Sequence, residues 1–175
     1  MISRNSFINL ALLTLIGFGG AGYFIIAVLL KQEFLSVLYG SVSGLLQMAI
    51  GLAYGALSAI IGWQIIKMPF QKETLQKYAG IIQGLELRIS DILLVSFCAG
   101  VGEELFFRGA IQPYLGIWPT AVVFVALHGY LNPFNWRISV YGAFMTLIIA
   151  GMGYMKVHFG LVSCCGSHLL TIPFE

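Results

Sequence analysis

The stretch FINLALLTLIGFGGAGYFIIAVLL, residues 7–30, contains no charged side chain. A helix needs about 20 consecutive apolar residues to cross the hydrocarbon core of a bilayer, so this stretch predicts a transmembrane helix. It lacks a small-residue cleavage site at the usual distance, which indicates a retained helix rather than a signal peptide. Lys31 and Glu33 follow it and mark its end.

The composition of the whole chain also favours lipid as its main solvent. Of the 175 residues, 59% are hydrophobic and only 9% are charged, whereas a soluble domain carries about 25% charged residues. So few charges cannot cover a surface that faces water. The net charge of +2 is too small to suggest a nucleic-acid partner. Cys98, Cys164 and Cys165 all lie in apolar segments, so they predict neither a disulfide framework nor a zinc ribbon.

Further apolar segments follow the first one along the chain. They cover residues 34–66, 90–114, 118–131 and 138–155, and a sixth begins near residue 159 and continues to the C-terminus. We therefore expect an all-α, polytopic transmembrane helical bundle of about six spans, the last one short or truncated. No internal repeat or second domain is visible, which predicts a single membrane-embedded domain over residues 1–175.

Glycines recur within the first two segments at spacings typical of helix packing in lipid. The first segment has Gly17, Gly19, Gly20 and Gly22, which would let neighbouring helices approach closely. In the second segment, the GxxxG pairs Gly40/Gly44 and Gly51/Gly55 predict two helix-packing faces.

Residues 67–88 form the polar stretch between the second and third apolar segments. They suit either a solvated linker or an amphipathic helix on the membrane surface, with apolar residues at helical spacing: Leu75, Tyr78, Ile81, Ile82 and Leu85. Its basic residues outnumber the acidic Glu73 and Glu86, and Arg4 precedes the first span. The positive-inside rule therefore places the N-terminus and this loop in the cytoplasm.

The third apolar segment, LLVSFCAGVGEELFFRGAIQPYL at residues 93–115, carries Glu103, Glu104 and Arg108 in its middle. Each such charge costs about 2.5 to 3.5 kcal/mol at the centre of a membrane helix. Glu104 and Arg108 are four residues apart and can pair on one helix face. Glu103 lies about 100° round the helix from Glu104. The alternatives are a purely structural buried cluster and a functional site, and ionisable groups inside a membrane favour the latter.

Two histidines lie at the same expected depth as Glu103. His128 belongs to the fourth segment and His168 to the sixth. Counted at 1.5 Å per residue from the non-cytoplasmic face, all three lie roughly 14 to 18 Å deep. This convergence predicts one polar site built from three helices, whereas His158 falls at a span boundary beside Lys156. There a glutamate could act as general base while the histidines hold water and stabilise an oxyanion. The same Glu103, His128 and His168 could instead hold a zinc ion, although the chain has no HExxH motif.

The segments EELFFR and FVALH contain an EExxxR and an FxxxH motif, in that order, followed by a late intramembrane histidine. This pattern resembles the CAAX protease and bacteriocin-processing (CPBP) family of intramembrane endopeptidases, often described as metalloproteases. The resemblance covers about residues 90–172. It implies that Glu103 activates water, that Glu104, Arg108 and Phe124 support the site, and that His128 and His168 complete it.

The resemblance also implies the partners of the chain, and the chain departs from the family at one position. The family's substrates are membrane-associated peptides or lipidated proteins, and its bacterial branches serve bacteriocin maturation and self-immunity. The short chain is similar to the bacterial branch, which implies an integral protein of the bacterial cell membrane. Ile172 stands four residues after His168, where the family usually has asparagine or aspartate. The alternatives to a protease are therefore a membrane immunity or scaffold protein without turnover and, less well supported, a proton-coupled transporter using Glu103.

Overall fold

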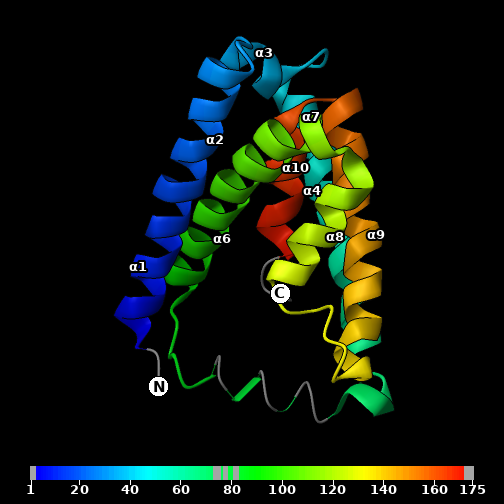
Figure 1. Cartoon of the computed structure of the whole chain (residues 1–175). Coiled ribbons are helices and arrows are strands. Elements are labelled where there is room, and N and C mark those ends of the chain that lie inside the picture. The colour runs from blue at the N-terminus through cyan, green and yellow to red at the C-terminus, as the bar shows by residue number, and fades with distance from the viewer. Residues whose placement is uncertain (1–2, 73–75, 77–78, 81–82, 172–175) are drawn as a thin grey trace.

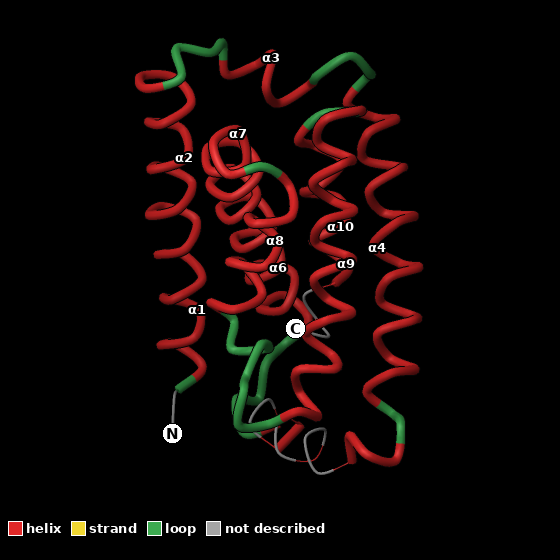
Figure 2. Tube along the Cα trace, turned by 45° about the vertical axis from the view of Figure 1, so that its right-hand side comes forward, coloured by secondary structure: helices red, strands yellow, loops and turns green. Residues whose placement is uncertain are grey.

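The computed structural model describes residues 3–72, 76, 79–80 and 83–171. Over these residues the chain is helical and contains no strand, as predicted for a helical membrane bundle (Figures 1 and 2). Three helical stretches are long and apolar enough to cross a membrane: Arg4–Leu29, Gly44–Ile66 and Trp136–His158. Of the five apolar positions that suggested an amphipathic helix over residues 67–88, four lie outside the described residues: Leu75, Tyr78, Ile81 and Ile82. Near the start of that stretch, Pro69–Gln71 form a short 3₁₀ turn.

The N-terminal stretch is one continuous helical rod along the side of the bundle (Figure 1). It consists of α1 (Arg4–Thr14), α2 (Gly20–Phe24) and the π-helical segments Leu15–Gly19 and Ile25–Leu29. A Cβ on Gly22 would lie 2.7 Å from the carbonyl carbon of Leu105, so this glycine allows the predicted close approach. Among the described residues, no atom lies within 4 Å of the place that a Cβ on Gly17 or Gly20 would take, so the prediction is wrong for these two.

Helix α4 (Gly44–Ile66) packs along the short C-terminal helix α10 (Leu161–Thr171). A Cβ on Gly51 or Gly55 would clash with the backbone oxygen of Ser163 or Ser167, respectively, which confirms the predicted packing face. The Gly40/Gly44 pair forms no such face. Gly40 has a φ of +55° and ends helix α3 (Phe34–Tyr39), whereas Gly44 begins α4. Because the helix breaks between them, their spacing places them on no common face.

The third apolar segment is helical from end to end. It comprises α6 (Ile89–Glu104), a π-helical segment at Leu105–Ile111 and α7 (Gln112–Leu115). Helix α8 (Ile117–Leu127) follows after the turn at Gly116. Helices α8 and α10 have 11 residues each, or about 16 Å of axial length, roughly half of the 30 Å hydrocarbon core. Over the described residues, each of these two helices is therefore shorter than the hydrocarbon core.

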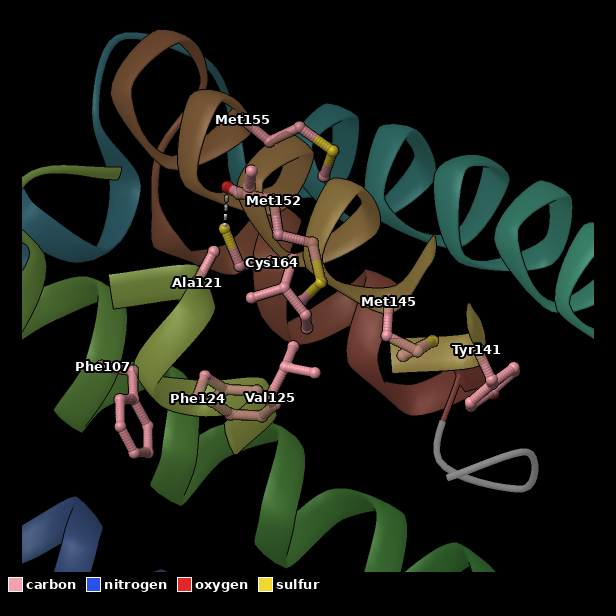
Figure 3. Packing of buried hydrophobic residues seen from close by; sticks show 11 residues of the cluster. Phe107, Ala121, Phe124, Val125, Tyr141, Met145, Met152, Met155 and Cys164 are labelled. Atoms are coloured by element: carbon pink, nitrogen blue, oxygen red, sulfur yellow. Dashed lines mark hydrogen bonds between the residues drawn. The ribbon is translucent and has the colours of Figure 1, made fainter. Parts of the chain in front are cut away.

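Helix α9 (Trp136–His158) packs against α8 and α10. Half of the residues in its most apolar stretch are buried, against 17% and 22% in the other two long helical stretches. Its inward face meets α8 and α10 in one apolar cluster that includes Phe107, Phe124, Met145 and Met152 (Figure 3). Within this cluster the thiol of Cys164 donates to the carbonyl oxygen of Met152 at 3.0 Å. The cluster thus joins the π-helical segment after α6 to α8, α9 and α10.

Candidate active site

The ionisable residues that the sequence singles out come from helix ends. Glu103 and Glu104 are the last two residues of α6, His128 caps the C-terminus of α8, and His168 lies near the end of α10. The π-helical segment that carries Arg108 begins directly after Glu104. Such segments are rare in helices and occur frequently at functional sites. The structure brings all five of these residues together.

Glu103 lies between the two histidines. Its Oε2 atom is 3.7 Å from Nε2 of His128 and 3.7 Å from Nε2 of His168. The side chain of His168 is 1% exposed and that of Glu103 is 11% exposed, whereas His128 keeps 29% of its side-chain surface open. The site is therefore reached from the side of His128. Separations of 3.7 Å exceed a direct hydrogen bond, but they are short enough for all three groups to act on the same small molecule.

The second nitrogen of each histidine fixes its tautomer. Nδ1 of His128 lies 2.8 Å from the carbonyl oxygen of Phe124, and a carbonyl can only accept. Nδ1 of His128 therefore carries the hydrogen, and its Nε2 presents a lone pair to Glu103 in the neutral ring. Nδ1 of His168 lies 2.9 Å from Oε1 of Glu104 and donates to that carboxylate. Both imidazoles thus direct Nε2 at Glu103.

Glu104 links His168 to Arg108. Its Oε1 accepts from His168, while its Oε2 lies 3.3 Å from Nε of Arg108, which confirms the predicted i,i+4 pair. Both side chains of that pair are almost completely buried, at 0% and 1% exposed. Burying either charge alone would cost several kcal/mol, so each requires the other.

Phe124 contacts three of the ionisable side chains. Its ring stacks on the imidazole of His128 with centroids 4.3 Å apart, and it meets the ring of His168 edge-on at 6.0 Å. The guanidinium carbon of Arg108 lies 4.7 Å from the Phe124 ring centroid, in cation–π geometry. Phe124 therefore forms an apolar wall that holds the two histidines and the arginine apart.

A zinc ion in a catalytic site takes three protein ligands and a water. Among the described residues, no group of three or more His, Cys, Asp or Glu side chains is arranged to hold a metal ion. As they stand, Glu103, His128 and His168 do not fit the ion. Ile172 lies outside the described residues.

Some features of the site were not predicted from the sequence. Tyr130 lies nearly parallel to the ring of His128, with centroids 6.3 Å apart, and meets Tyr141 of α9 edge-on. Phe107 packs edge-on against Phe124 at 4.9 Å. Neither belongs to a motif position, and only their proximity in the sequence to His128 and Arg108 hints at a role. His158 lies at the C-terminal end of α9, at the boundary where the sequence placed it.

Fold and site together define a helical membrane protein with an ionisable cluster buried between its helices. Residues 85–171 match the family model described as type II CAAX prenyl endopeptidase Rce1-like, and the chain belongs to this family. The match covers α6 to α10 and includes every residue of the site. It confirms the resemblance seen in the EExxxR and FxxxH motifs, and with it the general class of intramembrane endopeptidase. No curated protein and no solved structure matches the chain significantly.

Proposed function

We propose that the chain hydrolyses a peptide bond of a membrane-associated substrate with a water molecule activated by Glu103. The observation that carries the proposal is the position of Glu103 Oε2, 3.7 Å from Nε2 of both His128 and His168. A carboxylate in this place can accept a proton from water, which is general-base catalysis.

The different partners of Nδ1, a backbone carbonyl for His128 and a carboxylate for His168, would give the two histidines different roles. A water between Glu103 and His128 would give one hydrogen to each, because the Nε2 lone pair of His128 and the carboxylate are both acceptors. Its oxygen lone pair would then be directed at the substrate carbonyl. His168, protonated beside the carboxylate of Glu104, would donate its Nε2 hydrogen to the developing oxyanion.

Glu103 would accept a proton from the attacking water and return it to the leaving group. The water oxygen bonds to the carbonyl carbon while its proton passes to the Glu103 carboxylate. When the tetrahedral intermediate collapses, the C–N bond breaks and Glu103 returns that proton to the leaving amine. The products are a carboxylic acid and an amine, and the enzyme regains its starting state.

The substrate we propose is a peptide held at the membrane, either prenylated or of bacteriocin type, consistent with the family to which the chain belongs. The alternative is an immunity or scaffold protein that keeps the fold without turnover, which Ile172 favours. An immunity or scaffold protein of this kind should cleave no tethered peptide in its wild-type form.

The test uses the purified chain in nanodiscs with a prenylated and a non-prenylated membrane-tethered peptide. Glu103→Gln keeps the size of the side chain but cannot take the proton, so it should lower turnover by about 10²-fold or more. Glu86→Gln, at an exposed position outside the site, is the matched control and should cleave at the wild-type rate. Wild-type turnover in Glu103→Gln would contradict the assignment and make Glu104 the next candidate.

We further infer a bacterial cell membrane location with a cytoplasmic N-terminus, supported by Arg4 and the basic residues of the 67–88 stretch. A fluorescent protein that matures only in the cytoplasm should fluoresce when fused before Met1. Absence of fluorescence with full-length expression would reverse the orientation.

A further inference from the structure

A chain of aromatic contacts connects the N-terminal helix to the candidate active site. Phe18, in the π-helical segment Leu15–Gly19, stacks on Phe106 with centroids 5.0 Å apart and meets Phe107 edge-on at 5.8 Å. Phe107 meets Phe124 edge-on at 4.9 Å, and Phe124 stacks on His128 at 4.3 Å. Each of these contacts lies in the range where aromatic pairs attract beyond simple burial.

The inner rings in this series of aromatic contacts have little freedom to move. Phe107 is 3% exposed and Phe124 is 2% exposed, and both belong to the main apolar cluster. Side chains in such packing shift together, because an interior at crystal-like density has no space for one ring to move alone. Phe18 is 38% exposed and therefore supports the series of rings from its outer end.

The backbone on both sides of Phe18 is fixed against the helix that carries Glu103. A Cβ on Gly102 would lie 2.7 Å from the carbonyl oxygen of Thr14, and one on Gly22 would lie 2.7 Å from the carbonyl carbon of Leu105. Close approach at these two glycines holds the N-terminal helix in one register along α6. The ring of Phe18 is thereby placed at a set position relative to Glu103.

From these contacts we infer that Phe18 is a positioning residue for the reaction, acting through Phe107 and Phe124 on the ring of His128. Phe18 lies outside residues 85–171, the segment that matches the family. The N-terminal helix thus supplies part of the precision of a site whose ionisable groups all lie in the second half of the chain. The effect on turnover rests on the proposed function, whereas the effect on the position of the imidazole does not.

The test replaces Phe18 by Leu, which stays apolar in the helix but lacks the ring, and by Tyr, which keeps the ring. Phe24→Leu is the control, since Phe24 lies on the same rod and is 54% exposed. In Phe18→Leu we expect kcat on a tethered peptide to fall about tenfold with KM unchanged, because small misplacements of catalytic groups are costly. Phe18→Tyr and Phe24→Leu should keep the wild-type kcat. An unchanged kcat in Phe18→Leu, or an equal loss in Phe24→Leu, would overturn the inference.

A second measurement reads position without activity. In protein labelled with ¹⁵N-histidine, the ring signals of His128 and His168 are assigned with His128→Gln and His168→Gln, and His158 serves as an internal reference. We expect Phe18→Leu to move the His128 signal and leave His158 in place, with no movement in Phe24→Leu. Should Phe18→Leu fail to fold, Phe18→Met gives a second ring-free variant. A moved signal without any wild-type cleavage would refute only the proposed function, whereas an unmoved His128 signal would refute the role of Phe18.

Discussion

The carboxylate of Glu104 accepts a hydrogen bond from Nδ1 of His168 at 2.9 Å, and both side chains are buried. The same carboxylate faces Arg108 with its other oxygen at 3.3 Å. The charges of Arg108 and a protonated His168 would be balanced by the carboxylates of Glu104 and Glu103, the latter 3.7 Å from Nε2 of His168. In the proposed mechanism, the second glutamate of the EExxxR motif would orient His168 and favour its protonated form, whereas the first would face the reacting groups.

Glu104→Gln should lower kcat by about 10- to 100-fold, because a hydrogen bond to a charged group contributes about 1.5 to 3 kcal/mol. The amide can still accept from His168, but it no longer favours the protonated ring. Kinetics on a tethered peptide measure this loss. Glu86→Gln again serves as the control, and a Glu104→Gln enzyme as active as that control would show that His168 does not need the charge.

Arg108→Met should destabilise the protein by about 3 to 5 kcal/mol, the usual result of removing one partner of a buried ion pair. Methionine replaces much of the apolar stem, so the effect reports the charge rather than a cavity. Thermal unfolding in detergent measures the change, with Lys31→Met at an exposed position as control. Equal melting temperatures for the two variants would mean that the pair with Glu104 does not stabilise the fold.

Phe124→Leu should reduce both activity and stability. Leucine is smaller than phenylalanine, so the change leaves a small cavity that costs about 1 to 2 kcal/mol. In addition, leucine cannot stack on His128 or lie under Arg108 as the ring does. We expect kcat to fall about tenfold, since the loosened imidazole no longer holds the geometry. Leu161→Met, a buried change in the other apolar cluster, should leave kcat unaltered. Comparable kcat losses in both variants would assign the effect to general packing.

Gly51→Ala should destabilise the protein and lower activity together. Its Cβ would meet the backbone oxygen of Ser163 and force α10, which carries His168, away from α4. Overpacking of this kind costs about 1 to 3 kcal/mol. Gly17→Ala, where a Cβ meets nothing within 4 Å, is the matched control and should unfold at or above the wild-type temperature. Equal melting temperatures in the two variants would show that α4 and α10 can separate at no cost.

Metal analysis of the purified protein should find less than one zinc per chain, and cleavage should survive dialysis against a chelator. The reason is the donor set: Glu103, His128 and His168 are not arranged to hold an ion. Elemental analysis of wild type and of His168→Gln provides the comparison. One zinc per wild-type chain that is lost in His168→Gln would overturn this prediction and make these three residues metal ligands.

The ionisable site could be predicted because its signals are local or depend only on depth. Charges in the middle of an apolar segment single out Glu103 and Glu104, and constant helix rise places His128 and His168 at the same level. The aromatic chain through Phe18 could not be predicted in this way. Phenylalanines are common in membrane helices, and contact between two of them depends on helix rotation, which hydrophobicity does not report when every face is apolar.

The failed glycine prediction has a similar cause. The spacing of Gly40 and Gly44 equals that of Gly51 and Gly55, but a spacing has meaning only if the helix is continuous between its ends. Gly40 adopts a positive φ, which glycine tolerates best, and ends α3. The second segment is longer than a bilayer needs, so the sequence allows either one tilted helix or a short separate stretch before Gly40. The structure has the break at Gly40, between α3 and α4.

The short helix α8 has a consequence for how this chain can vary. The number of residues from the turn at Gly116 to His128 sets both the position of the imidazole along the helix axis and the direction in which it points. One inserted residue would turn His128 by about 100° away from Glu103 and displace it by 1.5 Å. No side-chain substitution could compensate for that rotation, whereas an insertion between Gly129 and Asn135, outside any helix, would leave the ring in place. The number of residues in α8 therefore sets the position of His128, and this number is as strongly constrained as the identity of the histidine at its end.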